Sequence, residues 1–476
     1  MLITVDDMSC DSVGVYGCEL EGTTPTMDRL ASQSLRFEHA HVTVGNCNPC
    51  RNVMFSGLIS HNNKVEGFYK VTDPGWPHMV DLLQGAGYYA GIHGKVSHSS
   101  PYQPYAWDDD LTISPSGKKA HIKDAKAYGE STSRGIENAG EAGKPFFLSI
   151  NISDPHKPFW SEVRGGGEDP YVPSRIYNAE EVPVPGFLFE DPEVREELAL
   201  YYSSVRRADD CLNEVLKALR KSGQWENTMI VFLSDHGMPL PFAKTQLYHH
   251  STRTPLMVRL PGTTKAGKLE SRHMVSVLDL LPTVLDSLGV PKPKRLDGRS
   301  FLPLLRGEKQ ESRDYVIKEY NENAGRSRDP MRAIQSKTHL YLFNPWSNGE
   351  RIFATATNGT VTCKRMIKLS EEDEEMNKRL ELYRFRVPEE LYQVNKDPDC
   401  LENLIDYASQ EKAKIKLQAF LEEWLEKTND PILECFRKRD DPEFVEAYIQ
   451  KLEEEANARR IKNKPSPKPK KEKKKS

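Results

Sequence analysis

Short runs of apolar residues alternate with longer amphipathic stretches over residues 1–313. Thr24-Pro25 and Asp191-Pro192 each place a proline where an amphipathic stretch begins, and Gly223 ends the second stretch, so both are predicted to be helices. Strands that alternate with helices indicate a mostly parallel sheet covered on both faces. Four apolar runs have the length of buried strands: Leu2–Val5, Tyr88–Ile92, Phe146–Ile152 and Thr228–Leu233.

A second pattern begins near residue 314. Three short strand-like runs, Tyr315–Glu319, Met331–Ile334 and Leu340–Phe343, are followed by an amphipathic stretch over Gln410–Lys427. This order predicts a smaller antiparallel sheet with a packed helix. We therefore divide the chain into a first domain (1–313), a C-terminal subdomain (314–440), and a charged helix with a disordered Lys/Pro tail (441–476). Residues 348–386 have no clear period and are predicted to be a loose insertion.

Acidic residues follow the ends of two predicted strands. Asp6-Asp7 comes directly after the first strand, and Ser234-Asp235-His236-Gly237 follows the last. Because parallel strands end at one edge of a sheet, these side chains can converge on one hard divalent cation, and oxygen ligands favour calcium or magnesium over zinc. Taken alone, either group would more often be a solvated turn or a helix cap. Their joint occurrence with the cysteine motif described below favours a site.

Basic residues follow the other strands, where they would suit an anion. Taken one at a time, they would more often be exposed lysines and ordinary histidines. The remaining histidines, His39, His61, His121 and His273, have no such context and are expected to be structural. The basic groups are His93-Gly94-Lys95 with His98, Asp154-Pro155-His156, and Lys244.

The most distinctive segment is Cys47-Asn48-Pro49-Cys50-Arg51, followed by Ser56-Gly57. Pro49 makes Asn48 extended and suits the first turn of a helix, so Cys47 is predicted to lie where a loop becomes a helix that Gly57 ends. The free amides and positive dipole at such a helix start favour an anion beside Cys47. Arg51, one turn later, is expected to fork onto the same anion.

Two other interpretations of the cysteine pair are a redox Cys-x-x-Cys and half of a zinc site. A zinc site would need a second ligand pair, but the next cysteine is Cys211, and Cys10 and Cys18 are too far apart to supply one. A redox pair would explain neither Arg51 nor Ser56-Gly57.

Cys-x-Pro-x-Arg followed by Ser-Gly resembles the motif of the formylglycine-dependent sulfatases, which belong to the alkaline phosphatase superfamily. The resemblance runs from Asp6 to about Asp430. At His236, at Lys244 and in the spacing of Lys95 and His98, the chain is more similar to iduronate-2-sulfatases than to sulfamidases. Most other blocks look like those of sulfamidases (N-sulfoglucosamine sulfohydrolases): Asp154-Pro155-His156, Glu181-Val182-Pro183-Val184-Pro185, Ser234-Asp235-His236-Gly237-Met238-Pro239, Leu278-Asp279-Leu280-Leu281-Pro282-Thr283, Pro330-Met331-Arg332-Ala333-Ile334-Gln335, and Leu391-Tyr392 with Asp397-Pro398.

The resemblance implies an α/β fold, an alkaline-phosphatase-like α/β/α sandwich with a mostly parallel central sheet and a smaller C-terminal α+β subdomain with an antiparallel sheet. Residues 1–313 would be the catalytic domain. A formylglycine-generating maturation enzyme would convert Cys47 to formylglycine, whose hydrate is the nucleophile. One divalent cation, most consistent with Ca²⁺, would be held by Asp6, Asp7, Cys47, Asp235 and His236.

The resemblance also implies roles for the basic residues. Arg51, Lys95 and Lys244 would bind the sulfate oxygens. His156, with Lys244, would protonate the leaving sugar oxygen or nitrogen, and His98 would remove the proton of the remaining hydroxyl so that sulfate leaves. Further candidates for the substrate pocket, whose rings could equally serve packing, are Tyr248, His249, His250, Arg253 and Trp160.

The implied reaction is hydrolysis of a sulfate ester or sulfamate of a sulfated carbohydrate, with a heparan-type N-sulfoglucosamine as the leading expectation. The alternatives are an O-sulfatase acting on another glycan, such as a uronate 2-sulfate or an algal polysaccharide, and a phosphonate or phosphate-ester hydrolase of the same superfamily. A third alternative is a binding protein that keeps the fold and whose Cys47 stays a thiol.

Composition and charge narrow the expected partners. The chain has 476 residues, of which 37% are hydrophobic and 29% charged, with a formal net charge of −4. Arg459–Ser476 carries ten basic residues and one acidic residue, so the rest of the chain is more acidic than this total and must bind a polyanion through a local basic pocket. We expect no nucleic-acid partner and no membrane span.

The compartment is predicted from two features. The sulfatases that the chain resembles are usually exported or lysosomal, so we expect an exported enzyme. This expectation holds although the sequence has no signal peptide at its start. Asn151-Ile152-Ser153 and Asn358-Gly359-Thr360 match glycosylation acceptors. The oligomeric state is left open.

Overall fold

The computed structural model describes residues 1–69, 71–162, 167–323 and 328–462. The predicted charged C-terminal helix is α14 (Pro442–Lys462). The predicted Lys/Pro tail falls mainly on residues 463–476, which lie outside the described residues. Within the described part of the chain, we find no helix that is long and apolar enough to cross a membrane.

The first two thirds of the chain form an eight-stranded sheet in which the four strands predicted from apolar runs are neighbours. The strands pair in parallel, except that β8 is antiparallel to both β7 and β2. In sheet order the strands are β5 (Asp109–Asp110), β4 (Tyr89–His93), β6 (Phe146–Pro155), β1 (Leu2–Asp6), β7 (Ile230–Ser234), β8 (Leu256–Arg259), β2 (Leu35–Phe37) and β9 (Lys268–Glu270).

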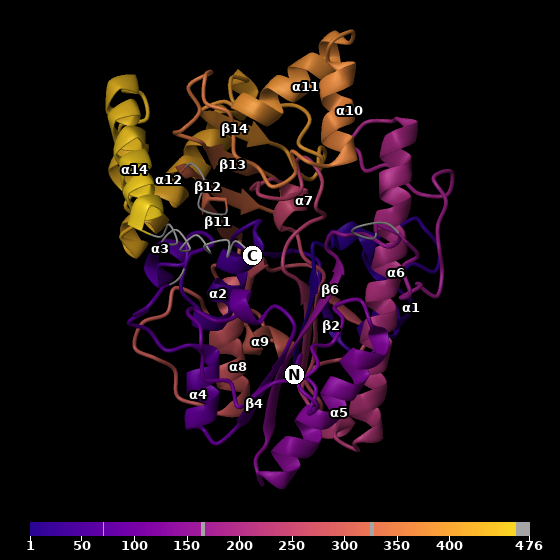
Figure 1. Cartoon of the computed structure of the whole chain (residues 1–476). Helices are drawn as coiled ribbons and strands as arrows, with labels where there is room; N and C mark the ends of the chain where they lie inside the picture. Colours follow the sequence, from indigo (N-terminus) through magenta and orange to yellow (C-terminus); the bar gives the residue numbers. More distant parts are fainter. Residues whose placement is uncertain (70, 163–166, 324–327, 463–476) are drawn as a thin grey trace, which may run out of the picture.

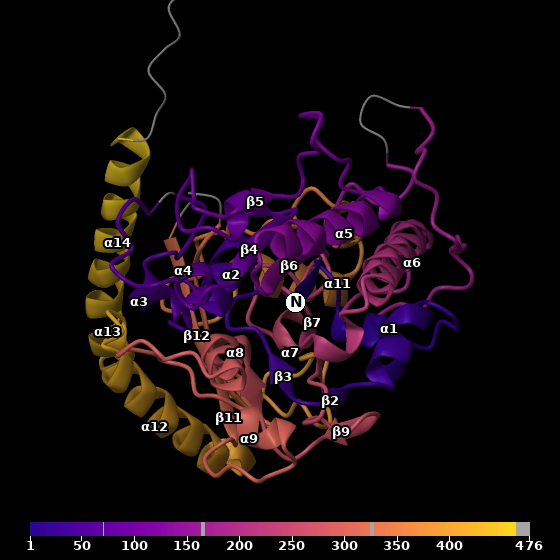
Figure 2. The same cartoon turned by 90° about the horizontal axis from the view of Figure 1, so that it is seen from below.

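Helices cover both faces of this sheet, as the alternating pattern predicts. The helix predicted at Pro192 begins there because Asp191 caps it, accepting hydrogen bonds from the backbone amides of Glu193 and Val194. One face carries α1 (Pro25–Ala31), α5 (Ala125–Glu141) and α6 (Pro192–Lys221), and the other carries α2 (Cys47–Ser56), α4 (Met79–Gly85) and α8 (Leu280–Leu288) (Figure 2).

The predicted smaller sheet lies over the carboxyl ends of the main strands (Figure 1). Its four antiparallel strands are β11 (Tyr315–Glu322), β12 (Arg328–Ser336), β13 (Leu340–Phe343) and β14 (Glu389–Tyr392). Helix α12 (Glu411–Thr428) packs on this sheet through a second apolar core that includes Ile334, Tyr341, Leu417, Leu421 and Leu425. The predicted fold class is therefore confirmed, while the domain boundaries stay a prediction.

The prediction that residues 348–386 form a loose insertion is wrong, because this region contains α10 (Val361–Leu369) and α11 (Glu374–Phe385). Helix α10 packs on α6, where Glu197 accepts a hydrogen bond from the Thr362 amide at 2.8 Å. Arg365 also pairs with Asp191 at 2.5 Å. These contacts join segments about 170 residues apart in the sequence, so no local pattern could indicate them.

Shorter elements complete the described chain. Strands β3 (Ala40–His41) and β10 (Val275–Ser276) form a separate parallel pair. The remaining short helices are α3 (Ser60–Asn63), α7 (His249–Thr252), α9 (Leu302–Leu305) and α13 (Leu433–Arg437), and 3₁₀ turns cover Cys10–Ser12, Gly14–Tyr16, Val96–His98, Trp225–Asn227, Val277–Asp279 and Ala408–Gln410.

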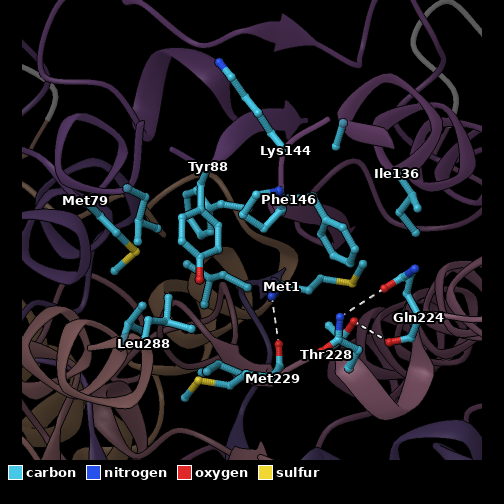
Figure 3. Close-up of a pocket in the computed structure, with 18 of the residues that line it drawn as sticks. Met1, Met79, Tyr88, Ile136, Lys144, Phe146, Gln224, Thr228, Met229 and Leu288 are labelled. Carbon is cyan, nitrogen blue, oxygen red and sulfur yellow. Dashed lines mark hydrogen bonds between the residues drawn. The ribbon is translucent and has the colours of Figure 1, made fainter. Parts of the chain in front are cut away.

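An apolar pocket of about 320 Å³ lies at the amino ends of the main strands (Figure 3). Its lining includes Met79, Tyr88, Phe146 and Leu288, and the Met1 ammonium beside it donates a hydrogen bond to the Met229 carbonyl at 2.8 Å. The charged residues singled out from the sequence follow the carboxyl ends of the strands, at the opposite edge of the sheet.

Candidate active site

Three buried aspartates meet at the carboxyl ends of β1 and β7, which are neighbours in the main sheet. Asp6 ends β1 and Asp235 follows β7. Asp7 has a left-handed backbone, with φ at 65°, and its amide donates a hydrogen bond to Asp235 Oδ1 at 3.1 Å. Such a conformation is strained for an aspartate and is typical of functional sites. The predicted convergence of the two strand ends is confirmed.

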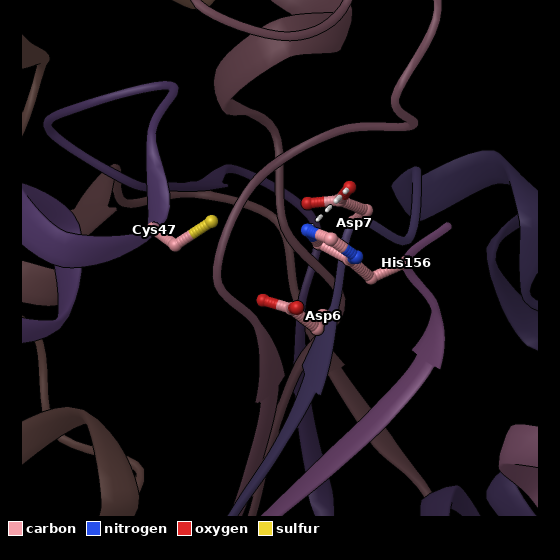
Figure 4. Close-up of side chains that lie close together, drawn as sticks. All are labelled: Asp6, Asp7, Cys47 and His156. Atoms are coloured by element: carbon pink, nitrogen blue, oxygen red, sulfur yellow. Dashed lines mark ion pairs between the residues drawn. The ribbon is translucent and has the colours of Figure 1, made fainter. Parts of the chain in front are cut away.

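Cys47 is the first residue of α2, and its side chain points toward these aspartates (Figure 4). Asn46 caps the helix by accepting a hydrogen bond from the Cys47 amide at 3.1 Å. Gly57 ends the helix with a left-handed backbone, at φ 63°. The predicted start and end of the helix are confirmed, and Cys47 lies at the positive end of the helix dipole.

His236 lies between Cys47 and the aspartates. Its Nε2 is 3.4 Å from Cys47 Sγ and 3.1 Å from Asp7 Oδ1. Its Nδ1 is 3.0 Å from the Gly237 carbonyl, and an acceptor there places a proton on Nδ1. Burial lowers the pKa of His236, but Asp235 and Asp7 outweigh burial and raise it to about 9.

Two lysines and a histidine line the open side of the aspartates. Lys95 contacts Asp6, and Lys244 Nζ lies 2.6 Å from Asp7 Oδ2. His156 Nε2 is 3.9 Å from the same Asp7 oxygen. The side chain of His156 is 36% exposed, against 13% for Lys95 and 9% for Lys244, so His156 is the most accessible of the three.

Arg51 does not lie where the sequence predicts. Its guanidinium is fully buried beneath the aspartates, 3.2 Å from Asp6 Oδ1 and 2.9 Å from Asp235 Oδ2. Its NH1 donates to Thr4 Oγ1 and to Asn151 Oδ1. The expectation that Arg51 forks onto an anion beside Cys47 is therefore wrong, because α2 directs this side chain at the sheet and its donors are used there. Arg51 instead holds the carboxylates in position.

His98 lies at the side of the site in the 3₁₀ turn after Lys95. Its carbonyl accepts a hydrogen bond from Asn52 of α2 at 3.1 Å, and its ring packs edge-on against Phe68 with centroids 5.3 Å apart. Burial first, and then the positive charge of Lys95, lower the pKa of His98 to about 4. The imidazole is therefore neutral at pH 7.

The donor set fits a divalent cation. The ligand atoms of Asp6, Asp7, Cys47 and His156 lie within 4.8 Å of one another, and so do those of Cys47, Asp235 and His236. Burial, together with the neighbouring charge of Asp6, raises the pKa of Asp235 to about 8. A cation bound among these carboxylates would offset that cost, because it favours the ionised form. Oxygen ligands are those that calcium and magnesium prefer.

A second group with metal-ligand side chains consists of His61, Glu319 and Asp430. Arg332 already pairs with both of its carboxylates, with contacts of 2.6 Å to Asp430 and 3.5 Å to Glu319. His61 Nδ1 lies 2.8 Å from Glu319. We therefore interpret this group as an ion-pair cluster, in agreement with the structural role expected for His61.

Sequence reasoning missed several residues that support the site. Asn151 begins a triplet that matches a glycosylation acceptor, but it is buried in β6, where its side chain accepts hydrogen bonds from Arg51 and Thr4. A polar residue inside an apolar strand was the available signal. Lys123 donates to Asp154 Oδ1 at 2.5 Å and to the His156 carbonyl at 2.7 Å, and Arg207 pairs with Asp154 at 2.6 Å. No sequence pattern indicated Lys123.

The further pocket candidates have partners inside the protein. Tyr248 donates to Glu390 at 2.9 Å, and His249 Nδ1 lies 2.8 Å from Gln335 Nε2. His250 pairs with Asp399 at 3.1 Å. Burial first, and then the charge of His250, hold the pKa of His249 well below its usual value. These contacts support packing for the three side chains. For the other two candidates, the structure shows the Trp160 amide bonded to Ser204 and the Arg253 amide in a turn with His249.

Comparison with known proteins identifies the family. Residues 1–290 match the family described as "Sulfatase", and residues 235–347 match "N-sulphoglucosamine sulphohydrolase, C-terminal". The chain belongs to the sulfatase family. It is 28% identical to the human N-sulphoglucosamine sulphohydrolase over 465 residues, which cover 90% of each protein.

Solved structures share the fold. One is a protein in complex with its substrate D-glucosamine-2-N,6-O-disulfate, with a TM-score of 0.67, 19% identity and coverage of 90% of this chain and 98% of the other. Another is the phosphonate monoester hydrolase of Agrobacterium radiobacter, with a TM-score of 0.65, 18% identity and coverage of 90% and 95%. The predicted family and fold are confirmed, and the chain is a hydrolase of sulfate esters or sulfamates. Membership of the family implies a divalent metal ion and a formylglycine.

Proposed function

We propose that this chain removes sulfate from a sulfated carbohydrate, with the N-sulfate of a glucosamine as its preferred target, and that Cys47 acts as formylglycine. The observation that carries the proposal is the position of Cys47, at the start of α2 and facing buried aspartates flanked by Lys95 and Lys244. Similarity to the human N-sulphoglucosamine sulphohydrolase over 90% of both chains supports the choice of target.

Asp6, Asp7, Asp235 and His236 would hold the metal ion, which we propose to be Ca²⁺ because three of the four side chains offer oxygen. When bound, this ion supplies Lewis-acid stabilisation of charge and lowers the pKa of a neighbouring hydroxyl. Arg51 contributes from below, where it keeps Asp6 and Asp235 in fixed orientations. The formylglycine at position 47 supplies, as its hydrate, the attacking hydroxyl and a second hydroxyl for product release.

The remaining polar side chains act on the substrate. Lys95 and Lys244 lie on the open side of the aspartates, where their ammonium groups can neutralise sulfate oxygens, each at roughly 3 to 4 kcal/mol of transition-state stabilisation. His156 is the most exposed and lies where its protonated form can give a proton to the leaving oxygen or nitrogen, although burial lowers the pKa of His156. His98, with a pKa of about 4, is unprotonated at pH 7 and can accept the proton of the second hydroxyl.

The test is expression together with a formylglycine-generating enzyme, followed by peptide mass spectrometry of the Cys47 segment and desulfation assays. We expect conversion of Cys47 and release of sulfate from N-sulfoglucosamine, lost on treatment with a chelator and restored by Ca²⁺. Full turnover with an unmodified thiol would contradict the proposal. Nitrophenyl sulfate tested against nitrophenyl phosphate separates a sulfatase from a phosphoester hydrolase.

One observation favours a second target. His236 contacts Cys47, and at this position the chain is more similar to iduronate-2-sulfatases than to sulfamidases. An O-sulfated uronate or algal oligosaccharide therefore belongs in the same screen. Cleavage of these compounds, with N-sulfoglucosamine left intact, would reassign the substrate without changing the chemistry. We also propose export, which fractionation of the native host would test.

A further inference from the structure

A short loop, residues 66–69, contacts the candidate site from outside the main sheet. The Gly67 carbonyl accepts a hydrogen bond from Asn48 Nδ2 at 2.6 Å, and Asn48 directly follows Cys47. The next residue, Phe68, packs edge-on against His98, with ring centroids 5.3 Å apart. The position of this loop therefore affects both the start of α2 and one of the proposed proton-transfer residues.

Two arginines hold the loop from its other side. Arg328, at the start of β12, pairs with Glu66 through NH1 at 2.8 Å. Arg459 of the C-terminal helix α14 contacts Glu322, and its guanidinium carbon lies 4.3 Å from the centroid of the Tyr69 ring. Both views of the fold show α14 running beside α3, which follows the Cys47 helix in the chain (Figure 1 and Figure 2).

Glu322 connects the two pairs. Its side chain is fully buried and also lies 3.6 Å from Arg328. Burial raises the pKa of Glu322, and Arg459 and Arg328 lower it, so the ionised carboxylate depends on both arginines. A Cβ atom at Gly67 would lie 2.5 Å from Glu322 Cγ. Any other residue would therefore clash with Glu322 at this position, and only glycine fits. Loop and carboxylate are therefore in direct contact.

We propose that Arg459 and Arg328 are positioning residues of the reaction, because they clamp residues 66–69 against Asn48 and His98. The C-terminal helix thereby becomes part of the active site. Arginine suits this task, since its planar guanidinium can pair with a carboxylate and stack on an aromatic ring at the same time. The inference rests on the proposed roles of Cys47 and His98.

The experiment compares Arg459→Ala, Arg459→Lys and Lys451→Ala in the full chain with the wild type. Lys451 is an exposed residue of the same helix and serves as the matched control. We expect Arg459→Ala to lower kcat for nitrophenyl sulfate roughly tenfold or more with little change in KM, because misplacement of reacting groups by fractions of an ångström is costly. Arg459→Lys should recover part of kcat, and Lys451→Ala should equal the wild type.

Two further measurements separate positioning from other causes. Mass spectrometry must find the same formylglycine fraction at Cys47 in all four proteins. Hydrogen exchange of the amides of residues 66–69 must be fastest in Arg459→Ala and must be the same in Lys451→Ala as in the wild type. Unchanged exchange there, or a loss of kcat that Lys451→Ala shares, would overturn the clamp. The exchange measurement needs no turnover, so an inactive wild type would refute the proposed function and still leave the clamp open to refutation.

Discussion

The ion-pair cluster around His61 predicts a specific dependence of stability on pH. His61 has a side chain that is 3% exposed, and its Nδ1 lies 2.8 Å from Glu319 and 3.4 Å from Asp430. Burial lowers the pKa of His61, but Glu319 and then Asp430 outweigh burial and raise it from 6.5 to about 9. At about 1.4 kcal/mol per pH unit, this shift corresponds to roughly 3 kcal/mol of folding free energy.

The sign follows from the direction of the shift. A histidine whose pKa is raised in the folded state stabilises the protein fully below its unfolded value of 6.5 and loses that contribution as the pH rises through 9. His61→Gln should therefore cost roughly 3 kcal/mol more at pH 6 than at pH 10. Urea unfolding of both proteins at the two pH values measures this cost. Groups that titrate alike in the wild type and in His61→Gln contribute equally to both free energies of unfolding, so they cancel when one is subtracted from the other.

Two results would refute this reasoning. A cost of His61→Gln that does not change between pH 6 and pH 10 would mean that the pKa of His61 is the same in the folded and the unfolded protein. A chelator that lowers the stability of the wild type by more than that of His61→Gln would show that His61, Glu319 and Asp430 hold a metal ion of their own, in spite of the nearby Arg332.

Three further predictions concern the candidate active site. Arg51→Met should destabilise the chelator-treated protein by about 3 to 5 kcal/mol in urea unfolding, because Asp6 and Asp235 lose their buried partner, and residual turnover should keep the wild-type KM. Lys244→Ala should lower kcat for nitrophenyl sulfate by roughly a hundredfold or more, whereas Lys217→Ala on the exposed face of α6 should have no effect. Asp235→Asn should retain less Ca²⁺ than the wild type after dialysis, as measured by elemental analysis, and equal metal content would contradict its role as a ligand.

The sequence predicts the site better where side chains follow a strand or begin a helix. The apolar runs before Asp6 and Asp235 indicate strands, and a parallel sheet brings strand ends to one edge, so the convergence of the carboxylates could be predicted without the structure. Pro49 and Gly57 likewise delimit α2 and put Cys47 at its start. Both predictions use only neighbouring residues in the sequence, and the structure confirms both.

The rest depends on contacts between distant segments. The sequence predicts the place of Arg51 on α2 but not the side of the helix that the sheet covers, so it cannot show that the guanidinium faces the sheet and not an anion. Lys123 supports His156 from a loop 33 residues earlier in the chain, and Arg459 reaches Glu322 across 137 residues. Contacts of this kind leave no spacing or periodicity in the sequence, because they depend on how whole helices and strands pack against one another.

The charges at the site connect the metal ion to anion binding. Arg51, Lys95 and Lys244 each contact at least one of the carboxylates of Asp6, Asp7 and Asp235. Lysines that are paired with aspartates cannot also neutralise sulfate oxygens fully. A divalent cation held by the same carboxylates would add two positive charges to the site and leave both ammonium groups to the substrate. Arg51 would remain below, since its donors are also used by Thr4 and Asn151. The arrangement therefore makes metal binding a condition of sulfate binding as well as of its chemistry.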